Sequence, residues 1–256
     1  MIEDILQPLA SERFLHDERY RDGHLRVINA LPHRRVLGMH TPDMKQLARK
    51  LFMQGDSADI IRAFGQEPSE SLSYEEMTIW GYLINLQKCT LDERLAMLER
   101  FIPVIDNWAV CDCWCCNAKW IAKADEERIW TFLQPYFDSR REFEVRFAVI
   151  VSMCYFLREE WLGRIFARLD SLDFDRIKSE YMSVRKRPQQ PQEGTVMGAE
   201  PYYVRMGVAW LLSMSLAKFE EQTRDYARGS KLPADVIKLY VRKARESFRT
   251  RTVNAL

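Results

Sequence analysis

Helical periodicity runs through nearly every long segment of the chain, and the alternation typical of β-strands is scarce. In the stretch TLDERLAMLERFI, apolar residues recur on one helical face, at Leu91, Leu95, Leu98 and Ile102. The stretches DEERIWTFLQPYF, EWLGRIFARL and PADVIKLYVRKARESF have the same spacing. The pattern predicts an all-α protein of about a dozen short helices joined by short loops.

Two helix starts are marked by local signals. Thr41-Pro42-Asp43 precedes MKQLARKLF, where the threonine is expected to cap the free N–H groups and the proline to fit the first turn. Ser73 and Glu76 have the spacing of a capping box before the apolar run that ends near Gln87.

A weak internal repeat favours an α-solenoid over a helix bundle. EVRFAVIVSM (144–153) and YVRMGVAWLL (203–212) align so that Arg146 and Arg205 occupy matching places, where each is expected to face a groove. We predict one repeat domain over residues 1–256. Residues 183–200 are polar, with two prolines and two glycines, and are predicted to form a long loop.

The net charge of +1 excludes a polycation, so binding to nucleic acid would need a local basic patch. One segment near the C-terminus provides six basic residues against two acidic ones: Lys238, Arg242, Lys243, Arg245, Arg249 and Arg251. A solvated helix face is the alternative interpretation. The sequence has no apolar run long enough to span a membrane and no secretory signal, so we expect a cytoplasmic protein with free thiols.

The stretch DNWAVCDCWCC (106–116) holds four cysteines, two tryptophans and two aspartates. A structural zinc site needs four ligands, usually from two separated pairs, and the four histidines of the chain all lie before residue 41. A redox CxxC site normally follows a strand, and none is predicted here. We therefore expect no metal, and we expect most of these cysteines to pack in a tight helix interface.

As a helix capped by Asp106 or Asn107, the same stretch places Trp108 and Asp112 on one face. A carboxylate beside an indole suits a cationic or electron-poor group, whereas a core tryptophan with a paired aspartate is the alternative. Arg146, embedded in the apolar run FEVRFAVI, is expected either to pair with a carboxylate or phosphate or to extend to the surface. Trp210 in the apolar run VAWLL is read as a core residue on pattern alone.

Taken together and in this order, DNWAVCD, FEVRFAVI, YYVRMGVAWLLS and RKARESFR resemble the AlkD-like DNA alkylation repair family, as does GMHTPDMKQLARKL near the N-terminus. The resemblance extends from about residue 20 to residue 250. It implies an α-solenoid of HEAT-like repeats that holds duplex DNA in a basic concave groove. It also implies a monofunctional glycosylase of base excision repair, which removes N3- and N7-alkylated purines without a cofactor.

The resemblance also assigns residues by motif position. Asp112 matches the catalytic aspartate, Trp108 and Trp210 match cleft tryptophans, and Arg146 matches the cleft arginine. The residues expected to contact DNA are Arg205, Lys238, Arg242, Lys243, Arg245 and Arg249. The expected partner is duplex DNA containing alkylated bases, bound by a monomer with no obligate protein partner and no membrane.

Two other functions remain open at this point. The modest net charge and the long loop fit a non-catalytic DNA-binding protein of the same fold, including one that binds branched DNA. A concave helical surface could also hold a peptide, which would make the chain a protein-binding HEAT scaffold. Salt separates the last function from the others, because binding to several phosphates weakens steeply as salt rises.

Overall fold

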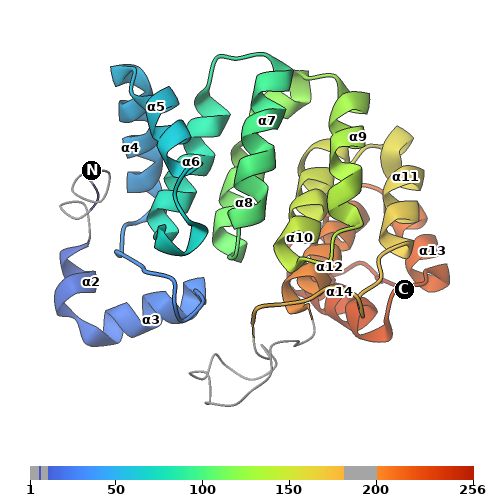
Figure 1. Ribbon diagram of the computed structural model, residues 1–256. Helices are drawn as coiled ribbons and strands as arrows, with labels where there is room; N and C mark the ends of the chain where they lie inside the picture. The colour runs from blue at the N-terminus through green and yellow to red at the C-terminus, as the bar shows by residue number, and fades with distance from the viewer. Residues whose placement is uncertain (1–5, 7–10, 182–200) are drawn as a thin grey trace. The chain divides into compact units, whose positions relative to one another are not determined.

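The computed structural model describes residues 6, 11–181 and 201–256, and the regular secondary structure of this part of the chain is helical (Figure 1). It contains thirteen α-helices and no strand; the only extended pairing in these residues is an isolated bridge between Arg141 and Lys178. The prediction of an all-α protein is confirmed. The predicted loop at 183–200 lies outside the described residues.

The chain divides into two compact units, which we describe one at a time. The described part of the first unit runs to Ala124, and the second comprises residues 125–181 and 201–256. The single repeat domain expected over residues 1–256 stays a prediction.

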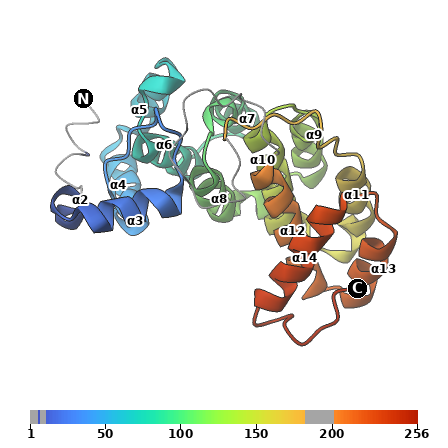
Figure 2. The same cartoon turned by 90° about the horizontal axis from the view of Figure 1, so that it is seen from below.

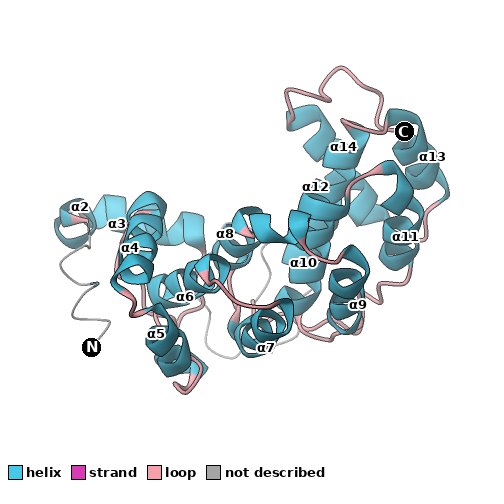
Figure 3. Ribbon diagram, turned by 90° about the horizontal axis from the view of Figure 1, so that it is seen from above, coloured by secondary structure: helices cyan, strands magenta, loops and turns pink. Residues whose placement is uncertain are grey.

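The first unit contains helices α2 to α8. Their bounds are α2 Glu12–His16, α3 Glu18–Ile28, α4 Thr41–Gln54, α5 Ser57–Phe64, α6 Tyr74–Leu86, α7 Leu91–Phe101 and α8 Trp108–Asn117. Helix α6 packs between α4 and α8, while α5 and α7 also pack on α6. Figure 3 shows α5 and α7 on the lower side of the row formed by α4, α6 and α8.

The second unit repeats this arrangement. Its helices are α9 Glu126–Phe137, α10 Glu142–Val151, α11 Glu159–Asp170, α12 Tyr202–Leu216, α13 Glu220–Gly229 and α14 Ala234–Glu246. Helix α12 packs between α10 and α14, α9 packs on α10, and α13 packs on α12 (Figure 2). Within each unit, successive helices therefore have the repeat-like packing of an α-solenoid.

Side-chain caps start four helices of the first unit, and Asp17 caps α3 by accepting the N–H of Tyr20 at 2.9 Å. Ser73 and Glu76 form the predicted capping box of α6, with Ser73 N–H donating to Glu76 Oε2 at 2.7 Å, and Thr90 with Glu93 forms another on α7. Asn107 caps α8 by accepting the N–H of Ala109 at 2.8 Å. The cap predicted at Thr41 is wrong. Thr41 is already the first residue of α4, and its predecessor His40 takes the capping position without a side-chain bond.

A glycine permits the close packing of α6 in the first unit. A Cβ on Gly81 would lie 2.9 Å from the ring of Phe101 and 3.1 Å from the indole of Trp114. Both rings are fully buried, and each aromatic side chain removed from water contributes about 2–3 kcal/mol. No described helix is long and apolar enough to cross a membrane.

Candidate functional site

The start of α8 is fixed by two sets of polar bonds. Arg34 binds the carboxylate of Asp106 through Nη2 at 2.7 Å and Nε at 2.9 Å, and both side chains are buried. Asn107 donates from Nδ2 to the carbonyl of Ile28 at 2.9 Å, so the end of α3 is held against the start of α8. Asn107 therefore bonds with both ends of its amide, and α8 begins from a fixed position.

Trp108 and Asp112 follow on one face of α8, four residues apart and each half-buried. Neighbouring residues of the helix are in the core, where Cys111, Trp114 and Cys115 are almost completely inaccessible to solvent. The structure thus places an indole and a carboxylate side by side on the outer side of a helix whose inner side is packed. Such a pair offers a π face and a negative charge to an approaching cation.

The cysteines of α8 serve mainly as packing residues. Cys111 and Cys115 are fully buried, which confirms the prediction of a tight helix interface for these two residues. Cys113 is half-buried, and burial with the neighbouring charge of Asp112 raises its thiol pKa above the ordinary value. In the described residues, no group of three or more His, Cys, Asp and Glu side chains is placed to hold a metal ion.

Arg146 lies in the second unit, in the interface of α10 with α12. Only 4% of the residue is exposed, and its Nη1 donates to the carbonyl of Tyr203 at 2.6 Å. Gly207 leaves room for it, because a Cβ there would lie 3.4 Å from Arg146 Nη1. Here the guanidinium holds the first turn of α12.

Glu142 is a functional candidate that the sequence did not single out. It is buried at the start of α10, where it accepts the N–H of Tyr203 at 2.6 Å and the hydroxyl of Ser179. Burial raises the pKa of its carboxyl to about 7, against the opposing effects of these hydrogen bonds and of Arg146. An acidic residue in a first turn is typical of an exposed helix start, so its pattern gave no signal.

Arg205 takes the matching place on α12 and binds the next helix in turn. Its Nη1 lies 2.6 Å from Asp235 Oδ2 and 2.7 Å from Oδ1, and its guanidinium lies over Phe174 at 5.1 Å. Arg146 and Arg205 therefore occupy matching places on α10 and α12, as the repeat predicted. Both side chains, however, are buried between helices rather than facing a groove. Trp210, further along α12, is half-buried.

The predicted DNA-contacting residues of α14 and the turn after it are mostly on the surface. Arg242 and Lys243 each lie near Glu246, at 3.5 Å and 3.8 Å. The other three are exposed and make no ion pair in the part of the chain that the structure describes: Lys238, Arg245 and Arg249. These three cations are available to phosphates.

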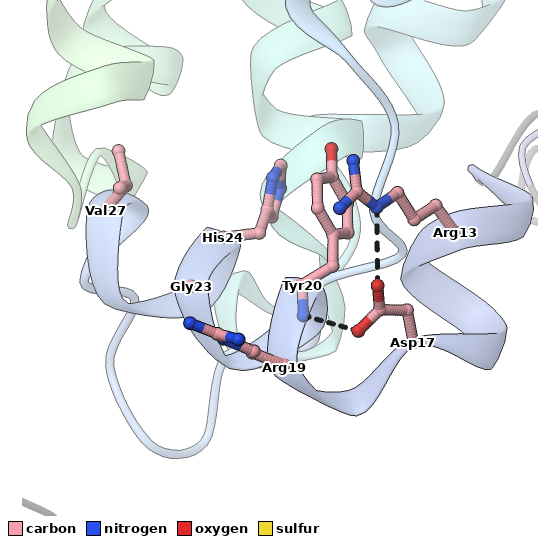
Figure 4. A pocket seen from close by; sticks show the side chains of 7 residues that line it. All are labelled: Arg13, Asp17, Arg19, Tyr20, Gly23, His24 and Val27. Carbon is pink, nitrogen blue, oxygen red and sulfur yellow. Dashed lines mark hydrogen bonds and ion pairs between the residues drawn. The ribbon is translucent and has the colours of Figure 1, made fainter.

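A surface cavity of about 670 Å³ lies along α3 in the first unit (Figure 4). Its lining combines arginines with two rings: Arg13, Asp17, Arg19, Tyr20, Gly23, His24 and Val27. Sequence reasoning missed it, although the aromatic and basic residues of ERYRDGHLRV lie at the spacing of one helical face.

A family model described as DNA alkylation repair enzyme matches residues 13–177, which is more than half of the chain. The match includes α3 to α11 and therefore Trp108, Asp112 and Arg146. Helices α12 to α14, with Trp210 and the basic residues near the C-terminus, lie beyond it. No curated protein and no solved structure matches the chain.

Proposed function

Because the chain belongs to the family of DNA alkylation repair enzymes, whose description supports a role in DNA repair, we propose that it is a DNA glycosylase. The proposed reaction is hydrolysis of the N-glycosidic bond of N3- and N7-alkylated purines in duplex DNA. The observation that carries the proposal is the pair of Trp108 and Asp112 on the outer face of α8, at a helix start held by Arg34 and Asn107.

The substrate explains why this pair would suffice. Alkylation at N3 or N7 puts a positive charge on the purine, so the base leaves as a neutral molecule with the electron pair of the C1′–N bond. Protonation by a general acid is then not needed. Positive charge develops on the deoxyribose as in other glycoside hydrolysis, and a fixed carboxylate stabilises it.

Asp112 has two tasks in this proposal. Its carboxylate stabilises the sugar cation and orients the water whose oxygen bonds to C1′, and it accepts the proton that the water gives up. Trp108 lies beside it on α8 and supplies a ring face to the same cation. The two side chains thus act on charge that is present only in the transition state.

In this proposal, residues of the second unit bind DNA phosphates and position the helix that carries Trp210. Lys238, Arg245 and Arg249 would bind phosphates, which requires no sequence preference. Arg146 acts as a positioning residue through the Tyr203 carbonyl, at the start of the helix that carries Trp210.

The test is release of 7-methylguanine and 3-methyladenine from methylated duplex DNA. We expect Asp112→Asn to lower the release rate about a hundredfold or more, the scale of losing one transition-state electrostatic contact, while DNA affinity is kept. Glu99→Gln, which removes the same charge from an exposed position on α7, is the control and should leave release unchanged. Retained release in Asp112→Asn would refute the role of Asp112. Salt-sensitive DNA binding without release by the wild type would instead indicate the non-catalytic DNA-binding protein.

A further inference from the structure

The cavity on α3 has walls of two kinds. Tyr20 and His24 lie four residues apart and present ring surfaces, as Figure 4 shows. The Arg13 guanidinium lies beside the Tyr20 ring, and the Arg19 side chain lines the cavity near Gly23. Gly23 lies one turn before Val27, and no atom would lie within 4 Å of a Cβ there, so the floor is open along the helix. A ligand of this cavity would meet ring faces and positive charge together.

The lining has a net positive charge, because one of its two arginines pairs with its aspartate and the other does not. Arg13 Nε lies 3.4 Å from Asp17 Oδ2, and the Arg13 guanidinium lies over the Tyr20 ring at 4.6 Å. Arg19 is exposed and makes no ion pair within the described residues. One cation of the cavity is therefore left for an anion such as a phosphate.

His24 adds an unsatisfied polar atom. Its ring packs edge-on to Phe14 at 5.3 Å, with Tyr20 and His40 further away, and its Nε2 is buried without a hydrogen-bond partner in the described part of the chain. Burial and the nearby His40 lower the pKa of His24, which favours the neutral imidazole. A buried polar atom with no partner is costly unless a ligand or water satisfies it.

The end of the cavity is also linked to the start of α8 by one hydrogen bond. Val27, at one end of the lining, precedes Ile28, whose carbonyl accepts the hydrogen bond from Asn107. Asn107 in turn precedes Trp108. Both features belong to the first unit, so DNA held at the outer face of α8 would pass close to the end of α3.

We propose that the α3 cavity binds one unpaired nucleotide of DNA, with its base against Tyr20 and His24 and its phosphate on Arg19. Aromatic side chains stack on bases of any sequence, and a basic residue beside them holds the backbone. A free phosphate would use Arg19 but not the rings, and a paired base could not reach the rings. This inference rests on the proposed binding of DNA and extends it to a second contact.

The test compares two fluorescently labelled duplexes that differ by one extra, unpaired nucleotide. We expect the wild type to bind the duplex with the unpaired nucleotide about tenfold more tightly, within the range that base–aromatic stacking provides. Tyr20→Phe keeps the ring and should keep this ratio. Tyr20→Leu keeps apolar volume without the ring and should reduce the ratio to about one, with unchanged affinity for the paired duplex.

Two arginine variants complete the design. Arg19→Ala should weaken binding of the duplex with the unpaired nucleotide more than that of the paired duplex. Arg62→Ala, which removes an exposed arginine from α5, should leave the ratio unchanged. Circular dichroism confirms that each variant is folded before binding is measured.

Three results would overturn the inference. They are equal wild-type affinity for the two duplexes, a preference that survives Tyr20→Leu, and an equal loss on both duplexes from Arg19→Ala. If one of these results is obtained and the wild type still releases alkylated bases, the proposed glycosylase is retained. Only the binding of a nucleotide in the α3 cavity is then refuted. Binding to neither duplex would refute both proposals.

Discussion

The start of α8 and the interface of α10 with α12 use charged side chains in opposite ways. At α8, the buried pair of Arg34 and Asp106 fixes the backbone, and Asp112 is left half-buried on the outer face. Between α10 and α12, Arg146 itself is buried and bonded to a backbone carbonyl. The difference teaches that a charge within an apolar helix has no fixed role. Its partner elsewhere in the chain decides whether it supports the fold or meets a ligand.

The largest difference should be between Asp106, which precedes α8, and Asp112, which lies within it. Arg34→Ala leaves the carboxylate of Asp106 buried without its main partner and removes bonds to the carbonyls of Ser69 and Leu72. We expect the free energy of unfolding to fall by about 3–5 kcal/mol in urea titrations. Asp112→Asn should change it by about 0.5 kcal/mol or less. Similar losses in the two variants would show that Asp112 is also a packing residue and would weaken its assignment to chemistry.

A smaller effect, dependent on pH, should come from Glu142. Its carboxyl has a pKa of about 7 in the folded protein against an ordinary value of 4.5, so the folded state binds the proton more strongly. Below pH 4.5 both states are protonated and this group does not change stability. As the pH rises to 7, the group lowers the free energy of unfolding by about 3 kcal/mol, at about 1.4 kcal/mol per unit of pKa.

Glu142→Gln isolates this contribution, because the amide oxygen still accepts the N–H of Tyr203 and cannot ionise. We expect the variant to gain stability relative to the wild type between pH 5 and pH 7, measured by urea unfolding at each pH. A constant difference over that range would mean that Glu142 stays ionised in the folded protein and that Arg146 compensates its charge.

The sequence predicted the helices because their signals are local. Apolar spacing marks one face, and capping pairs such as Ser73 with Glu76 lie within four residues of each other. The same is true of Trp108 and Asp112, whose shared face follows from helical geometry. Arg205 shows the limit, since its partner Asp235 is thirty residues away on another helix. Gly81, Glu142 and the α3 cavity were missed for the same reason: close packing, burial and cavity walls depend on segments that only the fold brings together.

The smallest effects on stability should distinguish Arg205 from Arg245, two arginines that the sequence predicted to contact DNA. Arg205 is 9% exposed and pairs with Asp235, whose side chain is 38% exposed, whereas Arg245 is exposed on α14 without an ion pair in the described residues. Allowing for solvent screening at Asp235, Arg205→Ala should lower the free energy of unfolding by about 1–2 kcal/mol. Arg245→Ala should not change it measurably.

For DNA binding, the order of the two variants should be reversed, with the larger effect from Arg245→Ala. The logarithm of the DNA association constant falls with the logarithm of salt concentration by about 0.9 for each phosphate contact. We therefore expect Arg245→Ala to reduce that slope by about 0.9 and Arg205→Ala to leave it unchanged, in titrations from 50 to 200 mM salt (roughly the range over which such slopes are resolved). A reduced slope in Arg205→Ala would mean that its guanidinium exchanges Asp235 for a phosphate when DNA binds. The two arginines would then differ in the free protein but not in the complex.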